Sequence, residues 1–149
     1  MITVCPLSEV ALNVRRLSPS HLISLLAPDE MIATPDGFAP ERHLKVGVND
    51  ICAPEAGCIV PAAVHVAGLV EFLRGWPAEG PLLIHCWAGV SRSTATAFIA
   101  LCLWNEGREM EAALALRRAA PHAQPNRLIV QLADEHLRRG GRMGAGDAG

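Results

Sequence analysis

Short apolar runs alternate with segments of helical periodicity along most of this chain, and this alternation constrains the fold more than any other feature. In the helical segments apolar residues recur at three- and four-residue spacing, whereas the runs are too short for helices. Strands that alternate with helices predict an α/β fold, with a mostly parallel central sheet of about four to five strands and helices on both faces. The predicted strands are Ile2–Cys5, His21–Leu26, His43–Asn49 and Pro81–His85, and the predicted helices are Ser8–Leu17, a segment opened by Pro61, Arg92–Asn105, Glu109–Ala120 and a segment capped by Asn126.

Two of the predicted helices show a clear apolar face, and a third carries a cysteine on its apolar stripe. We expect this residue, Cys102 in Arg92–Asn105, to lie in the core. In the helix opened by Pro61, the inward face is predicted to hold Val66, Leu69, Val70 and Leu73. In the helix after Asn126, it is predicted to hold Ile129, Leu132, Ala133, His136 and Leu137.

The length of 149 residues corresponds to a single domain, large enough to bury a core without disulfide or metal staples. Half of the residues are hydrophobic and 19% are charged, which argues against disorder. We expect residues 1–139 to form one domain. The glycine-rich segment 140–149 is predicted to be a flexible C-terminal tail.

Charge and cysteine usage exclude several functional classes. The net charge of −2 provides no broad basic field for nucleic acid or an anionic membrane, and no apolar stretch reaches the roughly 18 residues of a spanning helix. The start of the chain, MITVCPLSEV, lacks the pattern of a signal peptide.

Five cysteines without a Cys-x-x-Cys pair favour a reducing cytoplasm over a disulfide framework. The six scattered histidines predict neither a metal site nor a cofactor, and 12 arginines against one lysine indicate a GC-rich, bacterial genome.

The chemistry is concentrated in one strand–loop–helix segment, 82–94. A buried strand delivers Cys86 to the carboxyl edge of the sheet, where open α/β sheets bind ligands. The chain then turns within five residues into a helix that begins at Arg92. Backbone N–H groups in such a loop and the partial positive charge of the helix start form a cradle for an anion. The segment therefore predicts an anion site with a sulfur atom at its floor.

Each residue type in this segment suits phosphate chemistry. A thiol with a pKa near 8.5 falls to roughly 3.5–7.5 beside cations and helix N-termini, so Cys86 is predicted to be a thiolate nucleophile. The planar guanidinium of Arg92 can bind two phosphate oxygens at once, and Gly89 lets the loop bend. Ser93 can donate a hydrogen bond to Cys86 and make it a better leaving group, and His85 is expected to hold the loop rather than act as a base.

The segment His85-Cys86-Trp87-Ala88-Gly89-Val90-Ser91-Arg92-Ser93 resembles the signature loop of the cysteine-dependent protein tyrosine phosphatases, and most closely that of the compact dual-specificity group. Pro125–Leu132 is similar to the Pro-Asn segment that opens a late helix in that group, and the resemblance runs from about His21 to Leu137. It implies a three-layer α/β/α phosphatase fold, a phosphocysteine intermediate on Cys86 and phosphate binding by Arg92. It also implies a phosphate cradle made by the backbone amides of Trp87, Ala88, Gly89, Val90, Ser91 and Arg92.

The family uses an aspartate on a separate loop as general acid, which typically contributes 10²–10⁴-fold to the rate. Asp50 follows the predicted strand His43–Asn49 and should therefore lie at the same edge of the sheet as Cys86. After the first step the same group would activate water. Glu55 in the same loop, and Asp29 and Asp36 in an earlier loop, remain alternatives.

The substrate is constrained less tightly than the chemistry. The loop contains no lysine or second arginine, which disfavours a highly charged inositol phosphate, and the absence of tyrosine favours a shallow, broad site. The predicted partners are phosphorylated proteins or small phosphomonoesters, with phosphotyrosine, phosphoserine and phosphothreonine all open. A non-catalytic phosphate-binding module and a sulfurtransferase are the alternative functions.

Three further residues near the predicted site have two interpretations each. Trp87 can line the mouth of the pocket or simply pack against the domain. Cys52 and Cys58 lie in the loop of Asp50, where a redox partnership with Cys86 is conceivable. The favoured interpretation is that both are small, partly buried residues.

Overall fold

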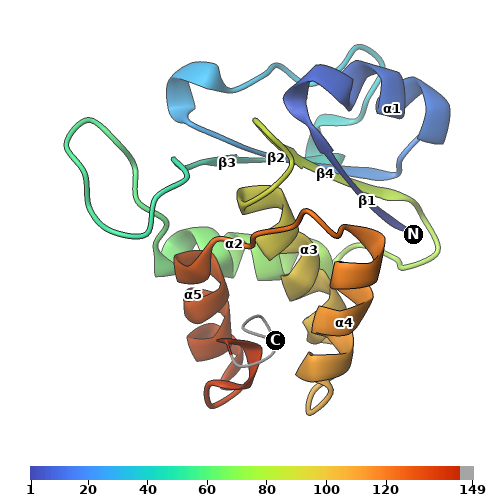
Figure 1. The fold of residues 1–149 in the computed structure, drawn as a ribbon. Coiled ribbons are helices and arrows are strands. Elements are labelled where there is room, and N and C mark those ends of the chain that lie inside the picture. The colour runs from blue at the N-terminus through green and yellow to red at the C-terminus, as the bar shows by residue number, and fades with distance from the viewer. Residues whose placement is uncertain (145–149) are drawn as a thin grey trace.

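The computed structural model describes residues 1–144 and contains one four-stranded sheet (Figure 1). Its strands are β1 (Ile2–Pro6), β2 (His21–Leu26), β3 (His43–Gly47) and β4 (Leu82–Cys86). They lie in the order β1-β4-β2-β3, and every pair is parallel. The predicted parallel α/β sheet is confirmed, and β4 lies between β1 and β2 in its interior.

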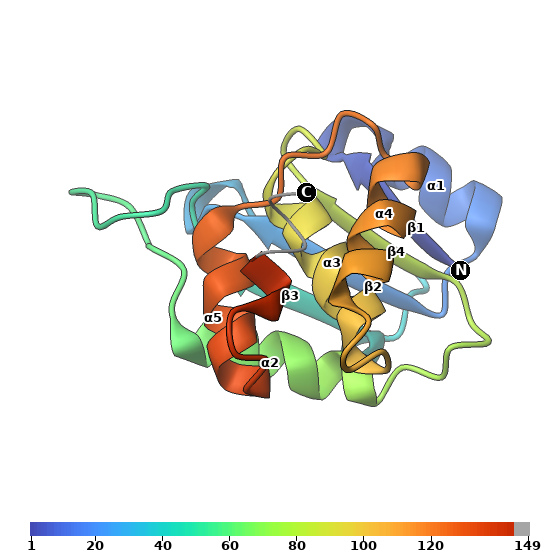
Figure 2. The same ribbon diagram turned by 60° about the horizontal axis from the view of Figure 1, so that its bottom comes forward.

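Helices cover both faces of the sheet, but unequally. Figure 1 shows α1 (Val10–Leu17) above the sheet and the other four helices below it. Figure 2 shows the same four from another side, grouped on one face of the sheet. The predicted three-layer α/β/α arrangement is therefore confirmed. The four helices are α2 (Ala63–Arg74), α3 (Arg92–Leu103), α4 (Glu109–Ala119) and α5 (Arg127–Leu137).

The main core lies between the sheet and the four-helix layer, with α3 at its centre. This helix packs against α2, α4, α5 and the sheet, and it is buried along most of its length, including Cys102. The predicted inward face of α2 is buried at all four positions. On the other side of the sheet, Leu22 and Leu83 pack against Val10 of α1 in a smaller apolar cluster. Because both sheet faces are covered, the two interior strands, β2 and β4, are buried along almost their whole length.

Element boundaries differ from the predictions by a few residues. Helix α2 begins at Ala63 rather than Pro61, because Ala62 is extended and its N–H donates to His65 Nδ1 at 3.0 Å. Strand β3 ends at Gly47, although Val48 N still donates to Leu26 O at 3.0 Å. None of the helices in residues 1–144 has the length and apolar character needed to cross a membrane.

One predicted core position in α5 is wrong. His136 is exposed, whereas its neighbour Asp134 is only 8% exposed. The Asp134 carboxylate accepts hydrogen bonds from the amides of Gly141 and Met143, both at 2.9 Å. The chain after α5 folds back over this face and uses the aspartate as its anchor, a contact that helical periodicity cannot reveal.

The chain beyond Arg139 keeps contact with the domain as far as it is described. Met143 is fully buried in the core, and Arg139 forms a buried ion pair with Glu109 of α4 at 3.1 Å. Residues 145–149 of the predicted tail lie outside the described residues. The domain boundary at residue 139 and the flexibility of the tail stay predictions.

Candidate active site

The last residue of β4 and the first residue of α3 bracket the predicted anion loop. Cys86 is 2% exposed, and Arg92 is 7% exposed. The Cys86 Sγ lies 3.1 Å from Ser93 Oγ and accepts a hydrogen bond from the amide of Gly89 at 3.3 Å. The sulfur therefore sits under the loop, within reach of donors from both the loop and the helix.

These donors determine the acidity of the thiol. Burial raises the pKa of Cys86, but the hydrogen bonds from the Ser93 hydroxyl and from the amides of Ser93, Gly89 and Ser91 outweigh it, so that the pKa lies below its ordinary value. Hydrogen bonding to the charged form is one of the three ways in which proteins shift a pKa. From the sequence we also expected adjacent cations to contribute, whereas here the lowering comes from hydrogen bonds, including the amides at the start of α3.

Gly89 is the position in the loop where a side chain cannot be accommodated. Its φ is +72°, and a Cβ would lie 2.8 Å from Pro6 N and 2.9 Å from the carbonyl carbon of Cys5. The loop also accepts a hydrogen bond at Trp87 O from Leu7 N at 3.1 Å. The loop is therefore held tightly against the carboxyl end of β1, and glycine is required for that close approach.

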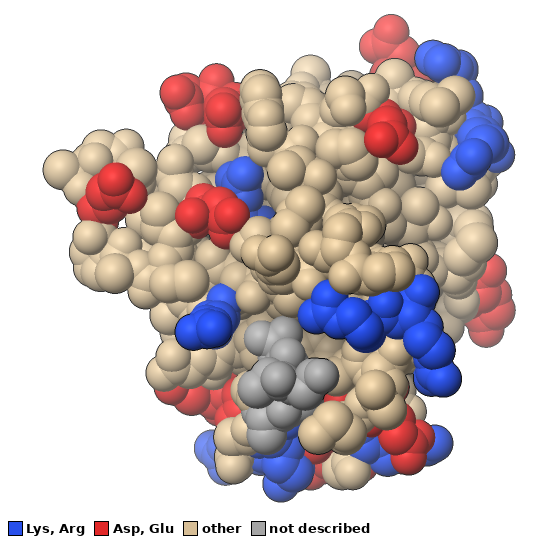
Figure 3. Space-filling model, in the orientation of Figure 1, with Lys and Arg blue, Asp and Glu red and all other residues tan. Residues whose placement is uncertain are grey.

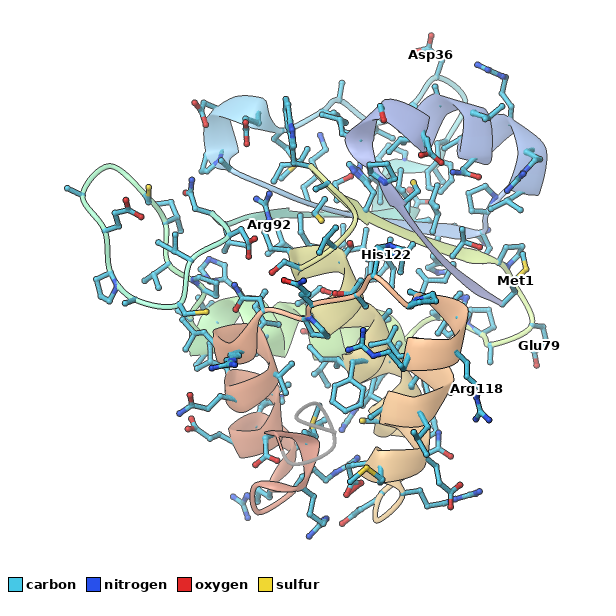
Figure 4. The ribbon with its side chains drawn as sticks, in the orientation of Figure 1. Met1, Asp36, Glu79, Arg92, Arg118 and His122 are labelled. Atoms are coloured by element: carbon cyan, nitrogen blue, oxygen red, sulfur yellow. The ribbon has the colours of Figure 1, made fainter. Side chains whose placement is uncertain are left out.

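Arg92 points back toward the chain that leaves β3 (Figure 4). Its Nη1 donates to Val48 O at 2.9 Å. Its Nε is buried and has no hydrogen-bond partner within residues 1–144. A buried donor without a partner costs about 1–3 kcal/mol, so an anion placed over the loop would satisfy a group that the protein leaves unpaired.

The structure places Asp50 beside this loop. Its Oδ1 accepts hydrogen bonds from Ser91 Oγ at 2.7 Å and from Asn126 Nδ2 at 2.9 Å. Asp50 lines a cavity of about 560 Å³ together with Cys86 and Arg92. The three rival carboxylates, Asp29, Asp36 and Glu55, do not line it.

Comparisons with known proteins find similarity to solved structures only. No protein-family model matches the chain, and no curated protein matches its sequence. Solved structures do match. The structure of DUSP15 is 18% identical, with a TM-score of 0.68 over 99% of this chain and 90% of that one. The Yvh1 phosphatase domain from Chaetomium thermophilum is 19% identical, with a TM-score of 0.67 over 95% and 93%. PTPMT1 in complex with PI(5)P is 15% identical, with a TM-score of 0.67 over 95% and 94%.

The fold is that of the dual-specificity phosphatases. Within this dual-specificity phosphatase fold, the segment that resembles the family's signature loop is the turn between β4 and α3. The Pro125-Asn126 segment packs behind the same turn, since Gln124 N donates to Val90 O at 2.9 Å and Asn126 N to Ser91 O at 3.1 Å. The two stretches that resemble the family in sequence are thus in direct contact.

His85 anchors the loop from inside the dual-specificity phosphatase fold. It is fully buried, and its Nδ1 lies 3.3 Å from Cys86 O, which can only accept, so Nδ1 carries the proton. Its Nε2 lies 2.6 Å from Ser24 Oγ, which in turn lies 2.8 Å from His43 Nε2. His43 Nδ1 lies 2.8 Å from Thr34 Oγ1. A single arrangement of protons satisfies this row, in which Thr34 donates to His43, His43 to Ser24, Ser24 to His85, and His85 to Cys86 O.

Both imidazoles in that row are neutral near pH 7. Burial lowers the pKa of His85, and the charge of Arg92 lowers it further against the opposing bond to Cys86 O. The pKa of His43 is lowered to about 4, mainly by burial and further by electrostatic interactions with Lys45 and His85. Sequence reasoning missed Ser24 and His43 as supports of the loop. The only available signal was a serine inside an apolar strand, since the pairing across β2, β3 and β4 is tertiary.

Sequence reasoning also missed two residues that line the cavity, Glu30 and Gln124. Glu30 ends a 3₁₀ turn after β2, a place that no periodicity marks. Trp87 is 55% exposed and lines the same cavity, which matches the first of its two interpretations. Cys58 is partly buried as predicted, whereas Cys52 is exposed, with its Sγ 3.7 Å from Asn126 Oδ1.

Proposed function

We propose that this protein is a metal-independent phosphomonoesterase of the protein tyrosine and dual-specificity type, which acts through a phosphocysteine on Cys86. One observation carries the proposal. A cavity holds a buried cysteine with a lowered pKa, an arginine whose buried Nε has no partner among the described residues 1–144, and an aspartate on its wall. A nucleophile, an oxyanion binder and an acid are the three groups that phosphoryl transfer to a side chain needs.

In the first step, the backbone amides of the loop and Arg92 hold the phosphate oxygens over Cys86. The thiolate attacks phosphorus, so that the S–P bond forms as the P–O bond to the leaving group breaks. The electron pair of that bond stays on the leaving oxygen, which takes a proton from Asp50. Both hydrogen bonds to Asp50 fall on Oδ1, which leaves Oδ2 to carry the proton.

In the second step, a water molecule attacks phosphorus from the side opposite sulfur. The Asp50 carboxylate takes a proton from this water, and the P–S bond breaks with its electron pair returning to Sγ. The Ser93 hydroxyl, 3.1 Å from the sulfur, stabilises the departing thiolate. Charge on the transferred group is stabilised throughout by Arg92 and the loop amides, which act as preorganised donors.

The site supports phosphorylated proteins or small phosphomonoesters as substrates. Residues 87–91 contain no lysine or arginine, so the loop itself recognises a single phosphate. The position of Asp50 in the cavity favours turnover over simple binding, because a binding site gains nothing from a carboxylate beside an anion.

Hydrolysis of p-nitrophenyl phosphate tests the proposal. We expect turnover that persists in a chelator, is blocked by vanadate and falls to background in Cys86→Ser. A Cys102→Ser variant is the matched control, since Cys102 is a buried core cysteine away from the loop. Phosphate binding without turnover in the wild type would support the binding module instead, and thiosulfate turnover would support the sulfurtransferase.

A further inference from the structure

One carboxylate that lines the phosphate cavity takes no part in the proposed reaction. Three lining residues come from outside the phosphate loop, namely Glu30, Asp50 and Gln124. Because the loop amides and Arg92 hold the phosphate, the remainder of the substrate meets these three residues. Asp50 is the proposed acid and Gln124 is neutral, so Glu30 is the group whose role is unassigned.

The Glu30 carboxylate is not neutralised by an ion pair. The ion pairs found in residues 1–144 engage Glu106, Glu109 and Glu111, and Glu30 takes part in none of them. Figure 3 shows acidic side chains over the turn after β2, at the upper left of the molecule. A carboxylate on the wall of a phosphate site repels the phosphate. This repulsion is offset where the substrate also carries a positive charge.

The fold holds Glu30 beside the phosphate loop. Glu30 ends the 3₁₀ turn Pro28–Glu30, and this turn follows β2, which pairs with β4. Glu30 N closes the turn by donating to Ala27 O at 2.9 Å. Pro28 also packs against the end of β3, since a Cβ on Gly47 would lie 3.4 Å from its Cγ. The neighbouring carboxyl ends of β2 and β4 therefore bring Glu30 to the cavity that the phosphate loop lines.

Trp87 adds an aromatic surface to the same cavity. Its side chain is 55% exposed and lines the cavity together with Glu30. Its backbone is held in place, because Trp87 O accepts a hydrogen bond from Leu7 N at 3.1 Å. The face of an indole attracts ammonium and guanidinium groups more strongly than that of any other aromatic side chain. A carboxylate and an indole that line one cavity are therefore suited to an organic cation.

We propose that Glu30 and Trp87 form a cation subsite, which selects phosphomonoesters whose leaving group carries an ammonium or guanidinium group. This inference rests on the proposed function, because it assumes that the phosphate binds over Cys86. The cation is supplied by a basic residue beside a phosphorylated side chain or by the amine of a small zwitterionic ester. An exposed carboxylate and an exposed indole together give a preference of about fivefold over a neutral analogue.

Binding to the Cys86→Ser protein measures the preference independently of turnover. The probes are fluorescent phosphotyrosine peptides that are identical except for Lys or Gln at each flanking position. The quantity is the ratio of the Kd values of the Gln and Lys peptides. A second arm compares displacement of the probe by phosphocholine and by its uncharged tert-butyl isostere, in which carbon replaces nitrogen. The two arms distinguish a basic peptide from a small zwitterionic ester as the source of the cation.

Variants of the turn and of the loop locate the preference. Glu30→Gln removes the charge and keeps the length of the side chain. Asp29→Asn is the matched control, because Asp29 is an exposed carboxylate in the same turn that does not line the cavity. Trp87→Leu removes the aromatic face, and Trp87→Phe keeps one.

Inorganic phosphate provides a second readout with the opposite sign. If Glu30 lies beside the bound phosphate, Glu30→Gln removes a repulsion and should bind inorganic phosphate more tightly, by about twofold. The same variant should bind the cationic probes less tightly. A merely structural role of Glu30 would weaken the binding of both.

We expect the Lys preference, the phosphocholine preference or both in the Cys86→Ser parent. The preference should fall to about twofold or less in Glu30→Gln, decrease in Trp87→Leu, and persist in Trp87→Phe and Asp29→Asn. No preference in the parent, or equal loss in Glu30→Gln and Asp29→Asn, would overturn the subsite, the latter by showing only a general field. An unchanged preference in Trp87→Leu would overturn the role of Trp87. Hydrolysis of p-nitrophenyl phosphate by the wild type tests the proposed function separately, so failure of one is distinguishable from failure of the other.

Discussion

Ser91 Oγ donates a hydrogen bond of 2.7 Å to Asp50 Oδ1 and so joins the phosphate loop to the loop after β3. The two residues belong to segments that are far apart in the sequence but meet at the carboxyl edge of the sheet. The contact fixes the proposed acid relative to the proposed nucleophile. In the proposed mechanism, this contact holds the acid on the wall of the cavity that Cys86 and Arg92 also line.

Removal of the acid should depend on the leaving group. Asp50→Asn keeps the hydrogen bonds at the equivalent oxygen but cannot donate the proton. We expect kcat for phenyl and alkyl phosphates to fall by about 10²–10⁴, and kcat for a substrate with a very acidic leaving group to change little. Glu55→Gln is the control, since Glu55 does not line the cavity. A large loss in Glu55→Gln, with none in Asp50→Asn, would transfer the role to Glu55.

Loss of the Ser93 hydroxyl should raise the pKa of Cys86. The Ser93 side chain is one of the groups that lower this pKa, so Ser93→Ala leaves less thiolate at a given pH. We expect the pH midpoint of alkylation by iodoacetate to move upward. We also expect the phosphoenzyme to accumulate, because sulfur becomes a poorer leaving group in the second step. A Thr96→Ala variant, which removes a buried hydroxyl bonded to Arg92 O, should leave the midpoint in place.

Gly89 and Gly57 provide a matched pair of left-handed glycines. Gly57 has a φ of +77°, and a Cβ added there would meet nothing within 4 Å, whereas a Cβ on Gly89 would meet backbone atoms at 2.8 and 2.9 Å. Gly57→Ala should cost about 1 kcal/mol of stability from backbone strain alone. Gly89→Ala adds steric overlap of about 1–3 kcal/mol and should abolish phosphatase activity. Urea unfolding gives both values, and equal costs at the two positions would show that the loop can move away from β1.

The free energy of unfolding should depend on His43. Burial lowers the pKa of His43 to about 4 in the folded protein, from 6.5 in the unfolded chain. The unfolded state therefore binds a proton first as the pH falls. The associated stability is fully present above pH 6.5 and is lost progressively as the pH falls toward 4, by up to about 3 kcal/mol. Urea unfolding across this window should show a smaller loss in His43→Gln than in the wild type, and an unchanged loss would assign the effect to other groups.

The fold and the centre of the site could be predicted because their signals are local. Apolar runs and helical periodicity located the four strands and five helices. The spacing from His85 to Ser93 identified the loop. Asp50 could be chosen because parallel strands all end at one edge of the sheet, so a residue that follows β3 must lie near a residue that ends β4.

The remainder depended on contacts that no local pattern encodes. Asp134 is buried because the chain beyond Arg139 folds back onto it, and helical periodicity placed His136 there instead. Ser24 joins His43 and His85 only because β2 lies between β3 and β4. Glu30 reaches the phosphate cavity because the turn after β2 lies beside the loop after β4.

Direct trapping of a phosphoenzyme tests the central claim. The wild type is mixed with a phosphomonoester, quenched in acid within one turnover and digested, and the peptides are analysed by mass spectrometry. We predict one added phosphoryl group on the peptide that contains Cys86, with a larger yield in Ser93→Ala. Turnover without any phosphoryl group on Cys86, or with the group on another residue, would contradict this mechanism.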